Sequence, residues 1–423
     1  MVKYFRHAII ALFIAGKAAG QDAQSLTLEQ AYELSEKNYP VTKQSRLIEQ
    51  TAAISIDNLN KGYLPQLSLS GQATYQSEVT EVPIKVPGFD IESPSKDQYK
   101  LLADVNQVVY DGGIIREQKV LSQLNANVEQ QKVAVEIYKL KERISQIYLS
   151  VLYLDEQLKQ VALVGTDLQT GIKRVEAQVN NGVAFRSNLN VLKAEQLKTD
   201  QRVIELKASR KGLIETLALF LGHPISESTT FQWPANIRFN LGEIARPELK
   251  LYEQQTDLAD QQNNLIRAKN LPKASLFVQG GYGRPGLNML KNEFDLYYLG
   301  GVRVNWSLGG LYTKKKEKEQ VEVNKRIIDI QKETFLLNTN TQLKQTQSEI
   351  DKLQQLVATD DAIIDLRQQV KDAAKAQLEN GVITANDYLR EVNAEDQARQ
   401  ARITHKLQMI QAEINYQTIS GKL

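Results

Sequence analysis

The sequence predicts a mainly α-helical chain in which two very long, coiled-coil-like helices accompany four amphipathic β-strands. Three observations predict this fold class. The chain repeats itself at an offset of about 200 residues, apolar residues keep a heptad pattern over about 50 residues, and four segments of about ten residues alternate between apolar and polar side chains.

Composition excludes several classes of function. The 423-residue chain has 42% hydrophobic and 24% charged residues, 3 His and no Cys, so disulfides and thiolate metal sites are excluded. The formal net charge of +2 comes from 52 basic and 50 acidic side chains spread along the chain, which leaves no basic stripe for nucleic acid. His223 and His405 have no partners at ligand spacing, so we expect no metal site.

The N-terminus has the pattern of a secretory signal. Lys3, Arg6 and His7 precede an apolar run at residues 8–15, and small residues follow at 18–20. The run is shorter than the roughly 20 residues that a membrane-spanning helix needs, so we expect residues 1–20 to be a cleaved signal peptide. No later segment is apolar over 18 consecutive residues, and any membrane contact must therefore come from a surface patch or a barrel.

The rest of the chain contains an internal sequence repeat. Five short motifs recur in the same order, most of them at an offset close to 199 residues. The pairs are Asn181-Gly182-Val183 with Asn380-Gly381-Val382, Gly222 with Gly421, Gly112-Gly113 with Gly309-Gly310, Leu64-Pro65 with Leu271-Pro272, and Ala194-Glu195 with Ala394-Glu395. We predict a first structural repeat at residues 21–222, a linker at 223–245 and a second repeat at 246–423.

Each repeat is predicted to begin with a helix. The first starts at about Leu28, with Thr27 as the expected cap, and ends before Pro65, because proline lacks an amide donor and disfavours helix at the residue before it. Its counterpart runs from Pro247 to just before Pro272. Two strands and a long helix follow in each repeat.

The long helix of the first repeat carries a heptad seam. Its apolar positions alternate steps of four and three residues, at Val133, Ile137, Leu140, Ile144, Ile147, Val151, Leu154, Leu158 and Val161, and continue through Leu168, Ile172, Val175 and Val179. The seam predicts one helix of about 70 residues, roughly 100 Å long. Its counterpart, from about Leu311 to Glu379, has a thinner apolar stripe, which suits a helix with one solvent-exposed face.

Four segments alternate with a period of two. Their apolar faces are Leu67, Leu69, Gly71, Ala73 and Tyr75; Leu101, Ala103, Val105 and Val109; Leu276, Val278 and Tyr282; and Tyr298, Val302, Val304, Trp306 and Leu308. Their length and terminal aromatics suit transmembrane strands, although a small soluble sheet with one wet face is an open alternative. Residues 78–96 and 284–293 contain the prolines and glycine of exposed loops. Four strands cannot close a barrel, and lipid does not tolerate an open edge, so several copies would have to combine their strands.

A short break containing glycine ends each long helix. The breaks are Asn181-Gly182-Val183-Ala184-Phe185-Arg186-Ser187 and Asn380-Gly381-Val382-Ile383-Thr384-Ala385-Asn386-Asp387-Tyr388-Leu389. Glycine permits the positive φ of a tight helix-to-helix turn, and Ser187 or Asn386 is expected to cap the returning helix. Either break alone suggests an ordinary turn, whereas two equivalent breaks at the ends of long helices favour a shared docking edge.

The duplication, the heptad seam and the two breaks resemble the TolC-like outer membrane efflux protein family over essentially the whole chain after the signal. The resemblance implies a homotrimer whose subunits each give four strands to a 12-stranded β-barrel in outer-membrane lipid, continuing into a periplasmic helical tunnel. It also implies that the hairpin tips at Asn181, Gly182, Val183, Asn380, Gly381 and Val382 meet a periplasmic adaptor (membrane fusion) protein linked to an inner-membrane transporter. Substrates would then pass through chemically unchanged.

The same resemblance makes Asp387 a candidate periplasmic gate, because family members carry acidic residues just after the second tip that narrow the tunnel mouth. The next acidic position of the family pattern is Arg390 here, and the site after the first tip is Asn188, so a tight anionic ring is not expected. The alternative for Asp387 is an N-terminal helix residue favoured by the helix macrodipole.

Other functions are weakly supported. Gly280-Gly281-Tyr282-Gly283 does not lead into a helix and so is no phosphate loop, and the scattered carboxylates are interpreted as solvated helix faces. We therefore expect that the protein is not an enzyme and that it binds no cofactor. A periplasmic coiled-coil structural or adaptor protein without a pore is the alternative function, although an adaptor would contain a single hairpin flanked by compact β modules.

Overall fold

The computed structural model describes residues 25–80, 93–234 and 243–422. The predicted signal peptide lies outside the described residues, as do the middle of the predicted loop at residues 78–96 and part of the predicted linker at residues 223–245.

The chain forms two compact units, and each takes segments from both halves of the sequence. Unit 1 comprises residues 1–39, 140–241 and 346–416, and unit 2 comprises residues 40–139, 242–345 and 417–423. The helices α3 (Ile114–Asn180) and α6 (Gly310–Glu379) contribute to both units. Packing therefore divides the chain differently from the order of elements along the sequence.

Helices α3 and α6 are the two long helices that the sequence predicts, with 67 and 70 residues. Side chains of the predicted seam in α3 are buried, and they include Val133, Leu140, Ile144, Val151, Val161, Leu168 and Val175. The thinner stripe of α6 is buried at Ile350, Leu353 and Ile364. In the described part of the chain, none of the helices contains a stretch long and apolar enough to span a membrane.

Unit 1 is built mainly from helices. It contains β1 (Ser25–Leu26), α1 (Leu28–Asn38), α4 (Arg186–Leu221), β4 (Thr230–Phe231) and most of α7 (Ala385–Ser420), and β1 pairs with β4 in parallel. Thr27 caps α1 as predicted. Its hydroxyl accepts a hydrogen bond from the Gln30 amide at 3.2 Å, and the Gln30 side-chain oxygen accepts one from the Thr27 amide at 3.0 Å.

The predicted single helix from Leu28 to Pro65 is wrong, because the chain forms two helices there. α1 ends at Asn38, and α2 (Thr42–Asn60) begins after Pro40 and continues into the short 3₁₀ turn η1 (Lys61–Tyr63). Tyr39, the residue before the proline, is extended at φ −65° and ψ 125°. Proline disfavours helical backbone at the preceding residue, so Pro40 ends the first helix well before Pro65.

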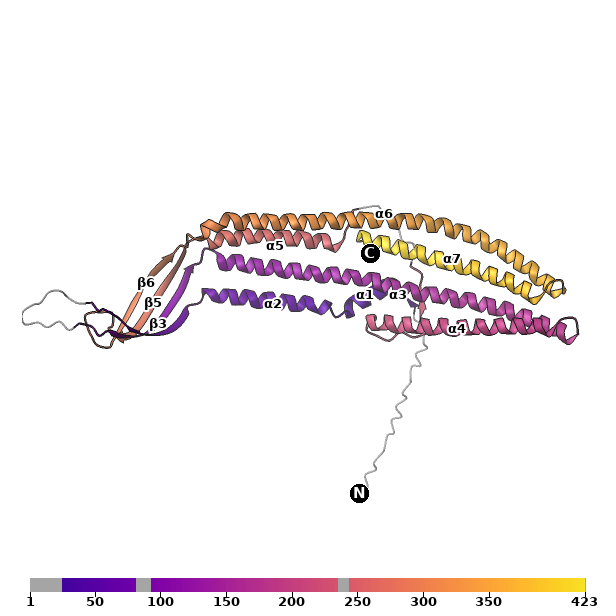
Figure 1. Cartoon of the computed structure of the whole chain (residues 1–423), viewed down its shortest axis with the longest axis horizontal. Helices are drawn as coiled ribbons and strands as arrows, with labels where there is room; N and C mark the ends of the chain where they lie inside the picture. The colour runs from indigo at the N-terminus through magenta and orange to yellow at the C-terminus, as the bar shows by residue number, and fades with distance from the viewer. Residues whose placement is uncertain (1–24, 81–92, 235–242, 423) are drawn as a thin grey trace, which may run out of the picture. The chain divides into compact units, whose positions relative to one another are not determined.

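Unit 2 contains one four-stranded antiparallel sheet and the helices that enter and leave it. The strands are β2 (Gln66–Tyr75), β3 (Asp97–Tyr110), β5 (Lys273–Arg284) and β6 (Asp295–Asn305), in the order β2-β3-β5-β6. Helix α5 (Pro247–Lys269) begins and ends as predicted. It packs beside the first part of α6 (Figure 1), through a core of Ala259, Ile266, Val321 and Ile328.

The two sequence repeats end on equivalent glycines. Gly222 follows α4 with φ +73°, and Gly421 follows α7 with φ +84°. A Cβ on Gly222 would lie 2.7 Å from the Asn38 side chain, and a Cβ on Gly421 would lie 2.3 Å from the Ala245 carbonyl carbon. Both positions need glycine for the left-handed backbone and for the lack of space.

Candidate functional site

The register of the sheet gathers the apolar residues of all four strands on one face. One row across the sheet is Leu67, Val105, Val278 and Gly300, the next is Leu69, Ala103, Gly280 and Tyr298, and a third is Gly71, Leu101, Tyr282 and Leu296. The large side chains in these rows are solvent-exposed in the single chain. A continuous exposed apolar face over four strands is typical of a wall that contacts lipid, and it is rare on soluble monomers.

The opposite face of the sheet is mostly polar. Its rows hold Ser68, Asp104, Gln279 and Leu299; Gln72, Lys100, Gly283 and Asp295; Gln66, Asn106, Phe277 and Gly301; and Ser70, Leu102, Gly281 and Tyr297. The Gln279 side-chain amide donates to the Asp104 carboxylate at 3.4 Å. Charged and amide side chains on this face suit contact with water, so the sheet has the two different faces that the sequence predicts.

Aromatic residues gather at the loop end of the sheet. The ring of Phe294 stacks with those of Tyr282 and Tyr99, at centroid distances of 5.5 and 6.3 Å. The Arg284 guanidinium lies 5.6 Å from the Tyr99 ring and also forms an ion pair with Asp97. Rings that are apolar at one end and reach polar partners at the other suit the boundary between lipid and water.

The helix end of the sheet also carries aromatic side chains. A bulge between Val108 and Tyr110 shifts the register, so that Tyr110 pairs with Ala274 in the apolar row that also contains Val304. The prediction that Trp306 and Leu308 belong to the last strand is wrong, because β6 ends at Asn305. The Trp306 indole instead donates to the Asn270 carbonyl at 3.2 Å, where the chain turns toward α6.

Both outer strands of the sheet have an unpaired edge. β2 pairs only with β3, and β6 pairs only with β5, among the strands that the structure describes. Each free edge is a row of about ten residues with unsatisfied backbone donors and acceptors, which another strand could pair.

The two predicted tips lie in unit 1, and both are tight turns between helices (Figure 1). Gly182 and Gly381 have φ of +74° and +72°, and a Cβ at either position would meet nothing within 4 Å. The amide of Val183 donates to the Gln178 carbonyl at 2.8 Å, and that of Val382 donates to the Gln377 carbonyl at 2.9 Å. The two turns therefore have the same hydrogen-bond pattern, and each glycine is required by the backbone rather than by close packing.

The two hairpins pack side by side just behind their tips. Their buried core comprises Leu168, Val175, Leu189, Leu192, Ala374, Leu378, Ala385, Tyr388, Leu389 and Val392. The Gln178 side chain donates to the carbonyls of Leu378 and Glu379 at 3.3 and 3.1 Å, and Arg174 forms an ion pair with Glu379. The tips thus form one continuous surface within unit 1.

Apolar side chains project from this surface. Val183, Phe185 and Val382 are 77%, 81% and 70% exposed. Phe185 was not among the predicted docking residues, although its position in the first break, beside an arginine, could have indicated it. An exposed phenylalanine and two exposed valines at the tips favour contact with an apolar partner surface.

The predicted caps Ser187 and Asn386 are wrong. Helix α4 begins after Phe185 without a side-chain cap. Helix α7 begins after Thr384, whose hydroxyl accepts from the Asp387 amide at 3.3 Å and donates to the Asp387 carboxylate at 2.7 Å. Each helix starts one residue before the expected cap, and a residue with a short polar side chain caps only when its own backbone is the last one outside the helix.

Asp387 therefore belongs to a capping box. Its carboxylate accepts from both the hydroxyl and the amide of Thr384, and these hydrogen bonds, together with the positive charge of Arg390, lower its pKa. The carboxylate is ionised at neutral pH and lies in the first turn of α7, where the helix macrodipole favours negative charge. Asp387 thus fits the alternative interpretation, in which it is an acidic residue at the N-terminus of a helix.

A buried ion network lies in unit 1 beyond the tips, where the sequence interpretation expected solvated carboxylates. Lys371 of α6 lies 2.7 Å from Asp167 of α3 and 3.6 Å from Glu395 of α7, and Glu395 also pairs with Arg399. Glu395 belongs to the Ala-Glu motif that recurs in both repeats, a signal noted in the sequence but not connected with burial.

A second polar cluster follows directly on α7. Asp396 accepts hydrogen bonds from Gln160 of α3 at 3.1 Å and from Arg202 of α4 at 3.2 Å. Nearby, His405 is not solitary in the fold, since its Nδ1 lies 2.6 Å from the Asp360 carboxylate. Neighbouring residues Glu395 and Asp396 thus connect α7 to three other helices.

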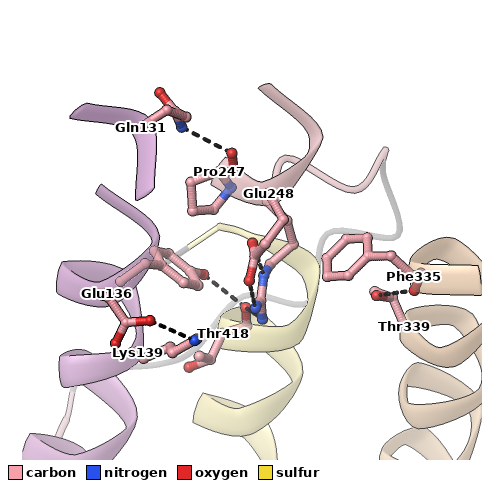
Figure 2. Close-up of polar contacts among 10 residues, drawn as sticks. Gln131, Glu136, Lys139, Pro247, Glu248, Phe335, Thr339 and Thr418 are labelled. Carbon is pink, nitrogen blue, oxygen red and sulfur yellow. Dashed lines mark hydrogen bonds and ion pairs between the residues drawn. The ribbon is translucent and has the colours of Figure 1, made fainter. Parts of the chain in front are cut away.

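In unit 2, the segment that leads into α5 is held by a polar clamp around Arg246. Its guanidinium pairs with Glu248, donates to the Thr418 carbonyl at 3.2 Å and lies 5.0 Å from the ring of Tyr138. Glu248 and Thr418 thus lie on the same guanidinium, and Gln131 of α3 donates to the Pro247 carbonyl at 2.9 Å (Figure 2). The clamp fixes the end of α7 against the start of the second repeat.

Comparison of the sequence with known families gives one match, over residues 31–223, to the model described as outer membrane efflux protein. Residues 31–223 of the chain are thus similar to the outer membrane efflux protein family. Comparison with curated proteins gives no match.

Solved structures share the fold of this chain. The outer membrane protein VceC from Vibrio cholerae is 15% identical with a TM-score of 0.65, and the alignment covers 93% of this chain and 96% of that chain. The Campylobacter jejuni CmeC outer membrane channel is 13% identical, with a TM-score of 0.64 and coverage of 93% and 85%. The open Neisseria gonorrhoeae MtrE outer membrane channel is 14% identical, with a TM-score of 0.63 and coverage of 94% and 89%.

The amphipathic sheet and the hairpin tips are thus parts of a fold that this chain shares with solved outer-membrane channels.

Proposed function

We propose that three copies of this chain form a channel in the outer membrane that serves as a passive exit duct of an efflux or secretion system. The observation that carries the proposal is the sheet of unit 2. It exposes one apolar face across four strands and leaves both edges unpaired. Pairing β6 of one copy with β2 of the next would satisfy both edges, and three copies would give a closed ring of 12 strands.

The tips support a role for a partner. Glycine-based turns of the same geometry end both hairpins, and they present the exposed Val183, Phe185 and Val382. We propose that this surface binds a periplasmic adaptor protein, which connects the channel to an inner-membrane transporter. In this proposal the channel does not change its substrates chemically.

Asp387 is proposed to place negative charge at the periplasmic mouth rather than to seal it. Its capping hydrogen bonds involve one carboxylate oxygen, Oδ2, and leave the charge on a half-buried side chain beside the second tip. Arg390 follows one turn later, so the local charges offset each other.

The channel proposal is tested by reconstitution. Purified full-length protein is expected to run as a trimer after cross-linking, to fractionate with outer membranes and to conduct ions in planar bilayers. A soluble periplasmic product without conductance would favour the coiled-coil adaptor alternative and refute the channel.

The docking proposal is tested by charges at the tips. Val183→Asp with Val382→Asp is expected to abolish export in cells while trimer yield and bilayer conductance stay unchanged. Leu219→Asp is the matched control, since Leu219 lies away from the tips on α4 and is 84% exposed. Export that survives the tip substitutions, or fails equally in the control, would assign the docking surface elsewhere.

A further inference from the structure

The start of α6, directly after the last strand of the sheet, is unusually basic. Lysines occupy positions 314, 315, 316 and 318, within the first three turns of the helix, and no acidic residue lies in its first turn. Positive charge near a helix N-terminus opposes the helix macrodipole and destabilises the helix unless an anion lies close by. Helix α3, which also begins at this end of the sheet, starts differently, because it carries Glu117 in its first turn.

The first sequence repeat provides an internal comparison. At the offset of the glycine pairs, Lys314, Lys315 and Lys318 correspond to Glu117, Gln118 and Leu121 of α3, and Lys316 corresponds to Lys119. Both helices leave the same sheet at the same end, yet only α6 carries the cluster. Helix formation after a strand therefore does not explain these lysines.

Most of these lysines face solvent. Lys315, Lys316 and Lys318 are exposed, and Lys316 forms an ion pair with the neighbouring Glu319, at 2.6 Å. No carboxylate in the described ranges forms an ion pair with Lys315 or Lys318. Leu311, Lys315 and Lys318 are spaced by four and three residues, so they share one side of the helix.

Exposed aromatic and apolar side chains precede the lysines along the chain. Trp306, Leu308 and Leu311 are exposed after the end of β6, and Tyr312 is 89% exposed. The order from strand to helix is thus apolar Val304, then aromatic and aliphatic side chains, then lysines. A bilayer changes in the same order, from hydrocarbon through the interface to the charged headgroups.

We propose that the first three turns of α6 bind the anionic phospholipid headgroups of the periplasmic leaflet of the outer membrane. Lys315, Lys316 and Lys318 contact the phosphates, and Trp306 and Tyr312 lie at the interface. The inference rests on the proposed function, because it requires the sheet to lie in the membrane with its helix end toward the periplasm. It adds a lipid partner that would fix the depth of the channel in the bilayer.

The test uses Trp306 as a local reporter. The chain has 2 Trp, so Trp233→Phe leaves Trp306 as the single fluorophore. Full-length protein is reconstituted in mixed vesicles of phosphatidylglycerol and phosphatidylcholine, with bromine on the acyl chains of one lipid or the other. We expect brominated phosphatidylglycerol to quench Trp306 several-fold more effectively at low salt, because each lysine near an anionic surface contributes about fivefold in binding.

Lys315→Gln, Lys316→Gln and Lys318→Gln together are expected to make the two lipids quench equally. Lys332→Gln, Lys344→Gln and Lys352→Gln form the control, since they remove the same charge from later turns of α6. Equal quenching by both lipids in the parent, or an unchanged preference in the triple variant, would overturn the inference. Inorganic phosphate that competes more than chloride at equal ionic strength would also overturn it, by assigning the lysines to a free anion.

The same vesicles separate this inference from the proposed function. If neither brominated lipid quenches Trp306, the sheet is not in the bilayer, and the channel proposal fails. If both lipids quench equally while the vesicles conduct ions, the channel proposal holds and only the lipid inference fails.

Discussion

Replacing Lys371 by methionine should destabilise unit 1 by far more than a typical surface lysine would. The Lys371 side chain is 11% exposed, and its ammonium lies between the carboxylates of Asp167 and Glu395, of which Glu395 is 4% exposed. Methionine keeps most of the side-chain volume and removes the charge. Two carboxylates then remain close together with one fewer cation, which disfavours their ionised forms.

The size of the effect follows from burial. Removing one partner of a fully buried ion pair costs roughly 3–5 kcal/mol. Asp167 is partly exposed and Glu395 keeps Arg399, so we expect about 2–3 kcal/mol. Unfolding entropy of about 2.1 cal/mol/K per residue gives about 0.9 kcal/mol/K for 423 residues, so the melting temperature should fall by about 2–3 °C.

The assay is thermal unfolding in detergent, followed by circular dichroism at the helix band. Lys352→Met is the control, because Lys352 pairs with Glu349 three residues away and both side chains are about half exposed, so it should shift the midpoint by less than about 1 °C. Adding Asp167→Asn and Glu395→Gln to Lys371→Met should recover most of the loss. The reasoning is refuted if Lys371→Met behaves like the control, or if neutralising the two carboxylates lowers the midpoint further.

Three more predictions concern the end of the chain, the sheet and the second tip. Gly421→Ala should destabilise the protein by about 2–4 kcal/mol, because its Cβ would meet backbone at 2.3 Å. Gly182→Ala should cost only about 1 kcal/mol of backbone strain, because a Cβ there meets no other atom within 4 Å. Equal denaturant midpoints for the two variants would contradict this. Leu69→Arg on the apolar face of β2 should cost about 2–4 kcal/mol and block membrane insertion, whereas Ser70→Arg on the polar face should insert normally, as measured by heat-modifiable gel mobility. The capping hydrogen bonds of Asp387 lower its pKa below 3.8, so they stabilise the start of α7 above that pH and are lost as the pH falls through the lowered pKa. Hydrogen exchange at the start of α7 should therefore show an acid-induced opening that Asp387→Ala removes. Identical pH profiles for the parent and the variant would argue against the capping box.

The long helices and strands could be predicted because their patterns are local. A heptad seam or a period of two is visible in any stretch of chain, and α3, α6 and the four strands begin and end within a few residues of the expected positions. The break at Pro40 was missed because the apolar pattern continues on both sides of it. The end of β6 before Trp306 was missed because alternation carries on after the backbone has left the sheet.

The candidate site was predictable only where backbone geometry demands a residue type. Glycine at positions 182 and 381 follows from positive φ, and both tips were located from the sequence. The ion pairs of Lys371 with Asp167 and Glu395 join three helices across more than 200 residues of chain, and no spacing within one helix could reveal them. The cap at Thr384 depended on the helix starting one residue before Asn386, a difference within the usual uncertainty of helix ends.

The two unpaired edges of the sheet have a genetic consequence. In the proposed ring every copy is the neighbour of both others, so a copy that cannot pair its strands leaves a gap that the other two cannot close. If a cell makes intact and edge-defective copies in equal amounts and they mix at random, about one trimer in eight contains intact copies only. Mutations that disable an edge of β2 or β6 without blocking assembly should therefore be dominant, and their severity should rise steeply with the dose of the mutant gene.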